Sequence, residues 1–136
     1  MGNMWQSLKD RCPDNIFMPG FTTRVYDYMK ASDYYISASD VEGLANTILE
    51  SMSVGLPMLL SDIPSHREVL ANVKEECIGY LIDNHSPVDI RTKIDKIMNI
   101  NYIEVSNILQ NLYEKKYTAK IMSRKYQKVY LDLMEK

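Results

Sequence analysis

Short apolar runs alternate with helical patterns along the first hundred residues of the chain. Runs of three to five residues, bounded by Gly, Pro, Ser or Asp, predict strands at residues 16–18, 34–37, 56–60 and 79–82. Apolar side chains at helical spacing predict helices near residues 24–31, between residues 44 and 54, and over residues 64–70. Strands that alternate with helices favour right-handed crossovers and a parallel sheet covered on both faces. We therefore expect an α/β fold built on a doubly wound parallel sheet.

The spacing of apolar residues also predicts which positions are buried. Residues 34–37 are expected to form a buried strand, and Val25, Tyr28 and Met29 are expected to point inward from the first helix. The next helix carries one apolar face, and Gly55 can end it in a left-handed conformation. That face consists of Leu44, Ile48, Leu49 and Met52.

Three capping signals open helices in the C-terminal part of the chain. Ser86 is followed by Pro87 and Asp89, Asn101 is followed by Glu104, and Thr118 precedes the last helical pattern. The last helix carries an apolar face of Met122, Tyr126, Val129 and Leu133. We divide the chain into a core over residues 1–100 and C-terminal helices over residues 101–136 that pack on it.

Two glutamates eight residues apart bracket the junction between the second predicted strand and its helix. Glu42 falls at the junction and Glu50 falls within the helix. Ligands of open parallel sheets bind at the carboxyl ends of strands, and a helix N-terminus offers free N–H groups to an anion. The six steps from Leu44 to Glu50 span roughly 9 Å of helix, which is comparable to the reach from a diphosphate to its ribose. By spacing alone such a pair more often marks solvated positions, but the geometry suits a nucleotide sugar.

Polar residues, glycines, a proline and two apolar residues lie between Ser37 and Leu70, at Ser39, Glu42, Gly43, Glu50, Ser51, Met52, Gly55, Leu56, Pro57, Ser61, Asp62 and Glu68. With these residues the segment resembles the nucleotide-sugar-binding motif of retaining family-4 glycosyltransferases with the GT-B fold, the glycosyl transferases group 1. The resemblance extends over roughly residues 15 to 100 and implies the C-terminal, Rossmann-like half of that fold, incomplete at its N-terminal side.

The resemblance also implies roles for individual residues. It makes Glu42 the contact for hydroxyls of the transferred sugar and Glu50 the contact for the ribose hydroxyls. It assigns contacts with the sugar and the diphosphate to the backbone around the helix start, at Gly43, Leu44, Ala45, Asn46 and Thr47. It places the nucleobase near the backbone of Gly20 and Phe21, although the Phe21 side chain fits an ordinary core position equally well. Ala45 stands where the family often has Gly, which bears on the identity of the donor sugar.

A chain of 136 residues can form one compact domain. It is too short for the two Rossmann-like domains of a GT-B enzyme. We therefore expect a fragment that lacks the N-terminal acceptor domain and is inactive by itself. The family places an Arg and a Lys on the donor diphosphate, and we find no convincing equivalent of that pair here. The resemblance implies a UDP-, GDP- or ADP-sugar donor as substrate, with no cofactor and no metal.

Charge is distributed unevenly along the chain. Residues 1–90 carry 6 Lys and Arg against 13 Asp and Glu, whereas residues 91–136 carry 10 against 5. Lys116, Lys120, Arg124 and Lys128 form a basic stripe that is either a solvated face or a contact with an anionic membrane surface. Nucleic acid is not an expected partner, because the whole chain is acidic and no aromatic residues interleave with the stripe. Without a predicted membrane span or signal peptide, we expect a cytoplasmic protein, with the inner membrane face as the alternative.

The remaining chemically active side chains carry no clear motif. Cys12 and Cys77 lack metal-ligand spacing, so we expect reduced structural thiols. His66 stands near a predicted helix start and is expected to be a surface or capping residue. His85 lies in a turn-rich segment and is assigned no function.

These observations favour the donor-binding part of a retaining glycosyltransferase in polysaccharide, capsule or glycolipid biosynthesis. One alternative is a stand-alone nucleotide-binding or regulatory module without transfer activity. Another is an inert fragment that forms a homodimer through the sheet edge left by the missing strands. A non-hydrolysing nucleotide-sugar epimerase shares the architecture, but the spacing of Glu42 and Glu50 argues for transfer.

Overall fold

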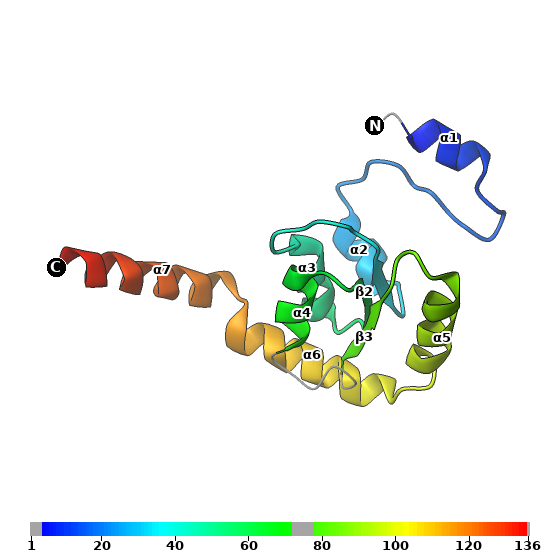
Figure 1. The fold of residues 1–136 in the computed structure, drawn as a ribbon. Coiled ribbons are helices and arrows are strands. Elements are labelled where there is room, and N and C mark those ends of the chain that lie inside the picture. The colour runs from blue at the N-terminus through cyan, green and yellow to red at the C-terminus, as the bar shows by residue number, and fades with distance from the viewer. Residues whose placement is uncertain (1–3, 72–77, 136) are drawn as a thin grey trace.

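A three-stranded parallel sheet forms the centre of the computed structural model, which describes residues 4–71 and 78–135. The strand order within these residues is β1-β2-β3, with β2 in the middle. Helices lie on both faces of the sheet (Figure 1). The expected α/β fold with a parallel sheet is thus confirmed. The strands are β1 (Tyr35–Ser37), β2 (Met58–Ser61) and β3 (Gly79–Ile82).

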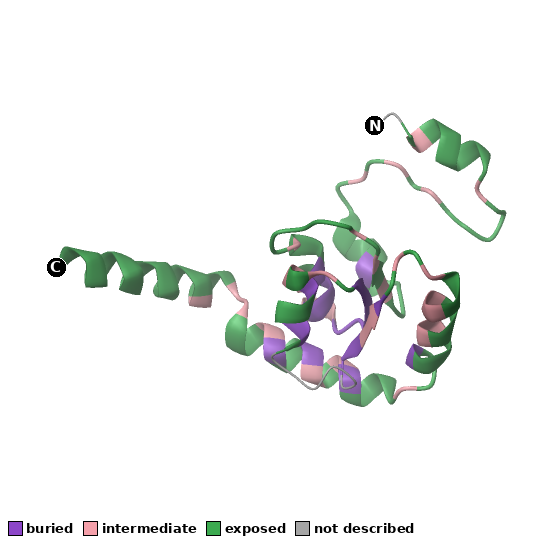
Figure 2. Cartoon of the chain, in the orientation of Figure 1, coloured by how far each residue is buried: buried purple, intermediate pink, exposed green. Residues whose placement is uncertain are grey.

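The two faces of the sheet bury cores of different size. One face packs against α3 (Asn46–Val54), α4 (Pro64–Leu70) and α6 (Tyr102–Lys116), and the other packs against α5 (Pro87–Ile97). The buried residues of the larger core are Ile48, Met52, Met58, Leu60, Val69, Leu70, Ile78, Val105, Leu109 and Leu112. Those of the smaller core are Leu59, Ile82 and Ile97. Burial is concentrated around β2, whose four residues are all buried (Figure 2).

The local start and stop signals of the helices are confirmed. The side chains of Ser86, Asn101 and Thr118 accept hydrogen bonds from the backbone N–H groups three residues later, at 3.2, 3.4 and 3.4 Å. Gly55 ends α3 with a φ of 79°. These elements follow from short-range chemistry, because a cap or a left-handed glycine acts within one helical turn.

The strand predicted at residues 16–18 is wrong. The chain between α1 (Trp5–Asp10) and α2 (Val25–Lys30) is irregular, and the Phe17 side chain is 77% exposed. An extended segment becomes a strand only when a neighbour accepts and donates its backbone hydrogen bonds, and the described sheet offers this segment no neighbour. Cys12 in the same segment carries a free thiol, whereas Cys77 lies outside the described residues.

The burial predicted for the elements nearest this segment is only partly correct. Ile36 in the middle of β1 is 53% exposed, so β1 is not a buried strand. In α2 only Met29 is buried, while Val25 and Tyr28 are exposed. The physical reason is that β1 lies at an edge of the sheet and α2 packs mainly on α3, which leaves the outer sides of both elements uncovered.

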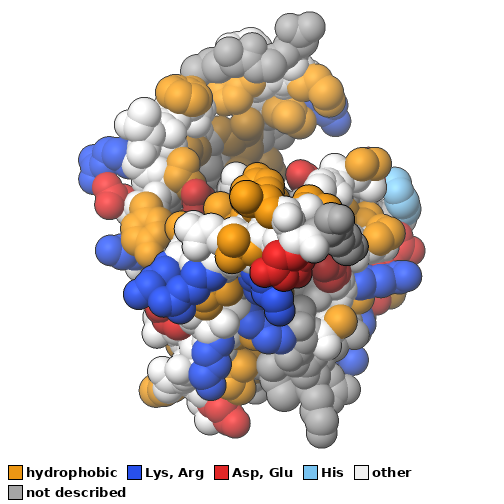
Figure 3. Space-filling model, turned by 90° about the vertical axis from the view of Figure 1, so that its left-hand side faces the viewer, with side chains coloured by type: hydrophobic (Ala, Val, Ile, Leu, Met, Phe, Trp, Pro, Cys, Tyr) orange, Lys and Arg blue, Asp and Glu red, His pale blue; other side chains and the backbone are white. Residues whose placement is uncertain are grey.

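The last helix, α7 (Ala119–Met134), extends away from the body of the molecule (Figure 1). Whereas α6 packs on the core as expected, α7 has no buried residue, and its main packing contacts are with α6. The predicted apolar face of Met122, Tyr126, Val129 and Leu133 is 53–62% exposed. On the face that Figure 3 presents, hydrophobic side chains lie beside groups of Lys and Arg. A membrane contact through this helix stays a prediction.

Over residues 4–71 and 78–135, no helix combines the length and the apolar character needed to cross a membrane.

Candidate donor site

Glu42 lies on the loop that leaves the carboxyl end of β1, as predicted. Its side chain is exposed, and the hydroxyl of Ser39 donates a hydrogen bond to its Oε1 at 3.0 Å. A hydrogen bond to a carboxylate is stronger than one between neutral groups, so this contact restrains the direction of Glu42. Gly43, the next residue, does not need a positive φ, and a Cβ placed on it meets nothing within 4 Å. The space beside Gly43 is therefore open.

The N-terminus of α3 follows directly on this loop. Its N-cap is Ala45, in an extended conformation, whose side chain cannot accept a hydrogen bond from the first turn. Asn46 and Thr47 form that first turn and are exposed, and the Thr47 hydroxyl lies 2.8 Å from the Tyr35 hydroxyl. A helix N-terminus without a side-chain cap keeps its N–H groups available for an anion.

Glu42 and Glu50 line two neighbouring surface hollows. The first, of about 380 Å³, contains Glu42 and faces the start of α4; the second, of about 400 Å³, contains Glu50 and lies between α3 and α6. Tyr117 lines both hollows. The first is lined by Glu42, Gly43, Leu44, Pro64, Ser65, Glu68, Val69 and Tyr117. The second is lined by Tyr26, Asn46, Leu49, Glu50, Ser53, Tyr113, Glu114, Tyr117, Ala119 and Met122.

The boundaries of the predicted site change slightly. Because α3 begins at Asn46, Leu44 precedes the helix, is 55% exposed and belongs to the Glu42 hollow instead of the apolar helix face. Four helical steps, roughly 6 Å, separate Asn46 from Glu50. The first turn and Glu50 therefore lie on one short helix, close enough to contact a single nucleotide.

Gly20 and Phe21 line neither of these two hollows. Gly20 has a φ of 75°, a conformation that glycine adopts without strain. The Phe21 side chain is 85% exposed, so the alternative that it fills a core position is wrong. Contact of this segment with a nucleobase stays a prediction.

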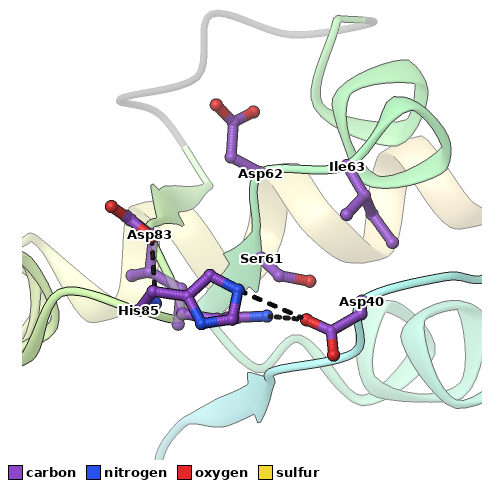
Figure 4. A pocket seen from close by; sticks show the side chains of 8 residues that line it. Asp40, Ser61, Asp62, Ile63, Asp83 and His85 are labelled. Atoms are coloured by element: carbon purple, nitrogen blue, oxygen red, sulfur yellow. Dashed lines mark hydrogen bonds and ion pairs between the residues drawn. The ribbon is translucent and has the colours of Figure 1, made fainter.

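A third cavity, of about 520 Å³, lies at the carboxyl ends of the strands (Figure 4). Asp40 reaches it from the loop after β1, Ser61 and Asp62 from the end of β2, and Asp83 and His85 from the loop after β3. Hydrogen bonds from the Arg67 guanidinium hold the pKa of the Asp62 carboxyl below its ordinary value. His85, to which no function was assigned, has its Nε2 atom 3.9 Å from Asp40 Oδ1.

The family model described as glycosyl transferases group 1 matches residues 6–118. The chain belongs to this family. The match begins within α1, includes every described element from α2 to α6, and ends directly before α7.

Several proteins similar to this group 1 chain are glycosyltransferases. The O-antigen biosynthesis glycosyltransferase WclY of Escherichia coli is 26% identical over 121 residues, which cover 88% of this chain and 32% of WclY. The poly(ribitol-phosphate) alpha-N-acetylglucosaminyltransferase of Staphylococcus aureus (strain COL) is 26% identical over 81% of this chain and 22% of its own length. This chain therefore spans about a third or less of the relatives that it matches.

A solved structure shares the fold of this group 1 chain. The pneumococcal O-GlcNAc transferase GtfA, in complex with UDP and GlcNAc, superposes with a TM-score of 0.68 at 19% identity. The likeness covers 96% of this chain and 27% of GtfA. It supports the predicted architecture, the C-terminal domain of a GT-B glycosyltransferase.

Two polar residues of this group 1 chain were not recognised from the sequence. His66, expected at the surface or in a cap, is fully buried. The sequence held a signal for this, because His66, Val69 and Leu70 recur at i, i+3 and i+4 on one face of α4 and all three are buried. Asn84 lies in the turn-rich segment that contains His85, and its side-chain amide nitrogen donates a hydrogen bond to the backbone oxygen of Ala38 at 3.0 Å. Such a contact between distant loops leaves no trace in sequence spacing.

Proposed function

We propose that this chain is the donor-binding part of a retaining glycosyltransferase that uses a nucleotide-diphosphate sugar. The single observation that carries the proposal is the arrangement at the junction of β1 and α3. There, the restrained carboxylate of Glu42, the uncapped first turn of α3 and Glu50 follow one another around two adjacent hollows.

The chemistry of these groups fits a sugar nucleotide. The departing diphosphate carries negative charge, which the N-terminal N–H groups of α3 around Asn46 and Thr47 would stabilise. Glu50 would accept hydrogen bonds from the ribose hydroxyls, and Glu42 would orient the transferred sugar. We assign the remaining stabilisation of the diphosphate to parts of the enzyme outside this chain.

The relatives support a UDP-sugar and a cell-surface product. The E. coli relative WclY is named for O-antigen biosynthesis, and the S. aureus relative transfers N-acetylglucosamine to poly(ribitol-phosphate). A further E. coli relative, 32% identical over 62% of this chain and 22% of its own length, is a UDP-Gal:alpha-D-GlcNAc-diphosphoundecaprenol alpha-1,3-galactosyltransferase. We therefore place the full-length enzyme in the biosynthesis of a polysaccharide, capsule or glycolipid, and we expect UDP to be the nucleotide.

Binding without transfer is the expected behaviour of the isolated chain, because its matches cover 32% or less of the relatives' lengths. We assign acceptor binding to the part that this chain lacks. A stand-alone regulatory module would also bind nucleotide. Adding the N-terminal domain of a close homologue distinguishes the enzyme part from the regulatory module. Sugar transfer is restored only if the chain is part of an enzyme.

A titration with UDP, GDP and ADP and their common sugar conjugates tests the proposal. Backbone amide signals of the isotope-labelled chain report where each compound binds. We expect one base to shift the amides of residues 43–47. If no compound shifts these signals at millimolar concentration, donor binding by this chain is refuted.

Replacing Gly43 with Ala should weaken sugar binding without lowering stability. A Cβ at Gly43 meets no protein atom within 4 Å, so the midpoint of urea unfolding should stay unchanged. The same methyl group would enter the space beside Glu42 that we assign to the sugar. We expect about tenfold weaker binding of UDP-N-acetylglucosamine, and unchanged binding of UDP, by calorimetric titration. If wild type and Gly43→Ala bind UDP-N-acetylglucosamine with equal affinity, the sugar does not lie beside Gly43.

A further inference from the structure

The loop that carries Glu42 is tied down through Ser39. The Ser39 hydroxyl donates to Glu42 Oε1 at 3.0 Å and lies 3.4 Å from the hydroxyl of Ser37 on β1. Ser39 is half-buried, whereas Glu42 and Gly43 are exposed. The position of the Glu42 carboxylate therefore depends on how firmly Ser39 is held.

Two other strand ends hold the backbone of Ser39. The hydroxyl of Ser61, the last residue of β2, donates to the carbonyl oxygen of Ser39. Asn84, in the loop after β3, has its amide nitrogen 3.4 Å from the same oxygen and 3.0 Å from the carbonyl oxygen of Ala38. Figure 4 shows Ser61, from the end of β2, and Asp40, from the loop after β1, among the residues that line the cavity at the carboxyl ends of the strands. The loop is thus held at the ends of β1 and β2 and by the loop that follows β3.

His66 completes the arrangement from inside the protein. Its Nδ1 atom lies 2.9 Å from the carbonyl oxygen of Ser61 and 3.1 Å from the Ser61 hydroxyl. A carbonyl oxygen only accepts hydrogen bonds, so Nδ1 carries a proton and donates. When the Ser61 hydroxyl accepts from Nδ1, its own proton is directed to Ser39. Both His66 and Ser61 are at most 1% exposed, which shields these bonds from competing water.

We propose that Ser61, His66 and Asn84 are positioning residues that act through Ser39 to hold Glu42 against the donor sugar. The inference rests on the proposed function for the role of Glu42. A carboxylate that recognises sugar hydroxyls has to be held within about 0.5 Å of its working position. The exposed Glu42 loop gains that restraint from these three residues.

Ser61→Ala tests the proposal, with Ser51→Ala as the matched control. Both serines are buried, but the Ser51 hydroxyl donates to Ile48 within α3 and does not contact the Glu42 loop. We expect Ser61→Ala to bind UDP-N-acetylglucosamine about five- to tenfold more weakly than wild type and to bind UDP equally well. Ser51→Ala should bind both ligands like wild type. Equal weakening of UDP and its conjugate in Ser61→Ala would overturn the proposal, because a general structural defect affects both.

Two substitutions of His66 separate its hydrogen bond from its volume. In His66→Asn, the side-chain amide nitrogen can take the position of the imidazole Nδ1. In His66→Gln, the longer side chain places its amide nitrogen at the position of Nε2 instead. His66→Asn keeps a donor for Ser61 and should preserve the preference for the sugar conjugate. His66→Gln should lose that preference, as Ser61→Ala does. If Asn and Gln give the same preference, the donor at Nδ1 is not what positions the loop.

Hydrogen exchange of the ligand-free protein keeps the test independent of nucleotide binding. We expect the amides of residues 39–43 to exchange about five- to tenfold faster in Ser61→Ala than in Ser51→Ala, because the restraint on the loop is removed. Unchanged exchange would overturn the positioning role. If wild type binds no nucleotide while the exchange prediction holds, the proposed function fails and the restraint on Glu42 stands.

Discussion

Gly79→Ala should destabilise the chain more than the same substitution at Gly43 or Gly55. Gly79 opens β3 directly beside Met58, the first residue of the central strand β2. A Cβ at Gly79 would lie 1.9 Å from the carbonyl oxygen of Met58 and 2.9 Å from its carbonyl carbon. Because both atoms belong to the backbone, the two strands would have to separate. We expect a loss of about 3–5 kcal/mol, which is a large part of the 5–15 kcal/mol that stabilises a typical domain.

Urea unfolding followed by circular dichroism measures this loss, and two further glycines serve as controls. Gly43→Ala should leave the unfolding midpoint unchanged, since its Cβ meets nothing. Gly55→Ala should fall between the two, because Gly55 has a φ of 79° and its nearest obstacle is the movable hydroxyl of Ser106. If Gly79→Ala unfolds at the same urea concentration as Gly43→Ala, the register of β2 against β3 differs from Met58 opposite Gly79.

Elements defined by neighbouring residues were predictable from the sequence. The bounds of β3 and α4 and the caps at Ser86, Asn101 and Thr118 match their predicted positions. Each depends on interactions within a few residues, which a single sequence displays. Burial was predictable where helices cover β2 on both sides, because a continuous apolar run identifies such a strand.

Features that depend on a distant neighbour were not predictable. Residues 16–18 have the apolar character of a strand but lack a strand to pair with among the described residues. Ile36 belongs to a run that predicts a buried strand, yet its side chain is 53% exposed at the edge of the sheet. The last helix has the predicted apolar face, yet the described residues provide no surface that buries it. In each case the sequence indicates the local conformation that the segment prefers. Burial also requires a neighbouring strand or helix, which the pattern within the segment does not identify.

The candidate site shows the same division between local and long-range information. The strand-to-helix junction that carries Glu42 and the helical position of Glu50 follow from local pattern, although the helix begins at Asn46 and not at Leu44. The contacts of Ser61 and Asn84 with the Ser39 backbone join residues 22 and 45 positions apart, so no spacing could indicate them. Only the burial of His66 was available from sequence, through its place on the buried face of α4.

Glu50→Gln should cause the largest loss of nucleotide affinity among single substitutions in the site. The exposed Glu50 carboxylate is the group that we assign to the ribose hydroxyls, and each hydrogen bond to a charged group contributes about 1.5–3 kcal/mol. Glutamine keeps the size of the side chain but not its charge. We therefore expect UDP to bind about 10- to 100-fold more weakly, measured by calorimetric titration, with no change in the urea midpoint.

Glu114→Gln is the matched control for this substitution, because Glu114 lines the same hollow and carries the same charge. Removing a negative charge near an anionic diphosphate favours binding slightly, so Glu114→Gln should bind UDP as well as wild type or marginally better. Direct contact of Glu50 with the ribose predicts a second result. 2′,3′-Dideoxy-UDP lacks both hydroxyls and should bind wild type and Glu50→Gln equally, because the two changes remove the same interaction. If the dideoxy compound still distinguishes the two proteins, or if both glutamine variants lose affinity alike, Glu50 does not hold the ribose.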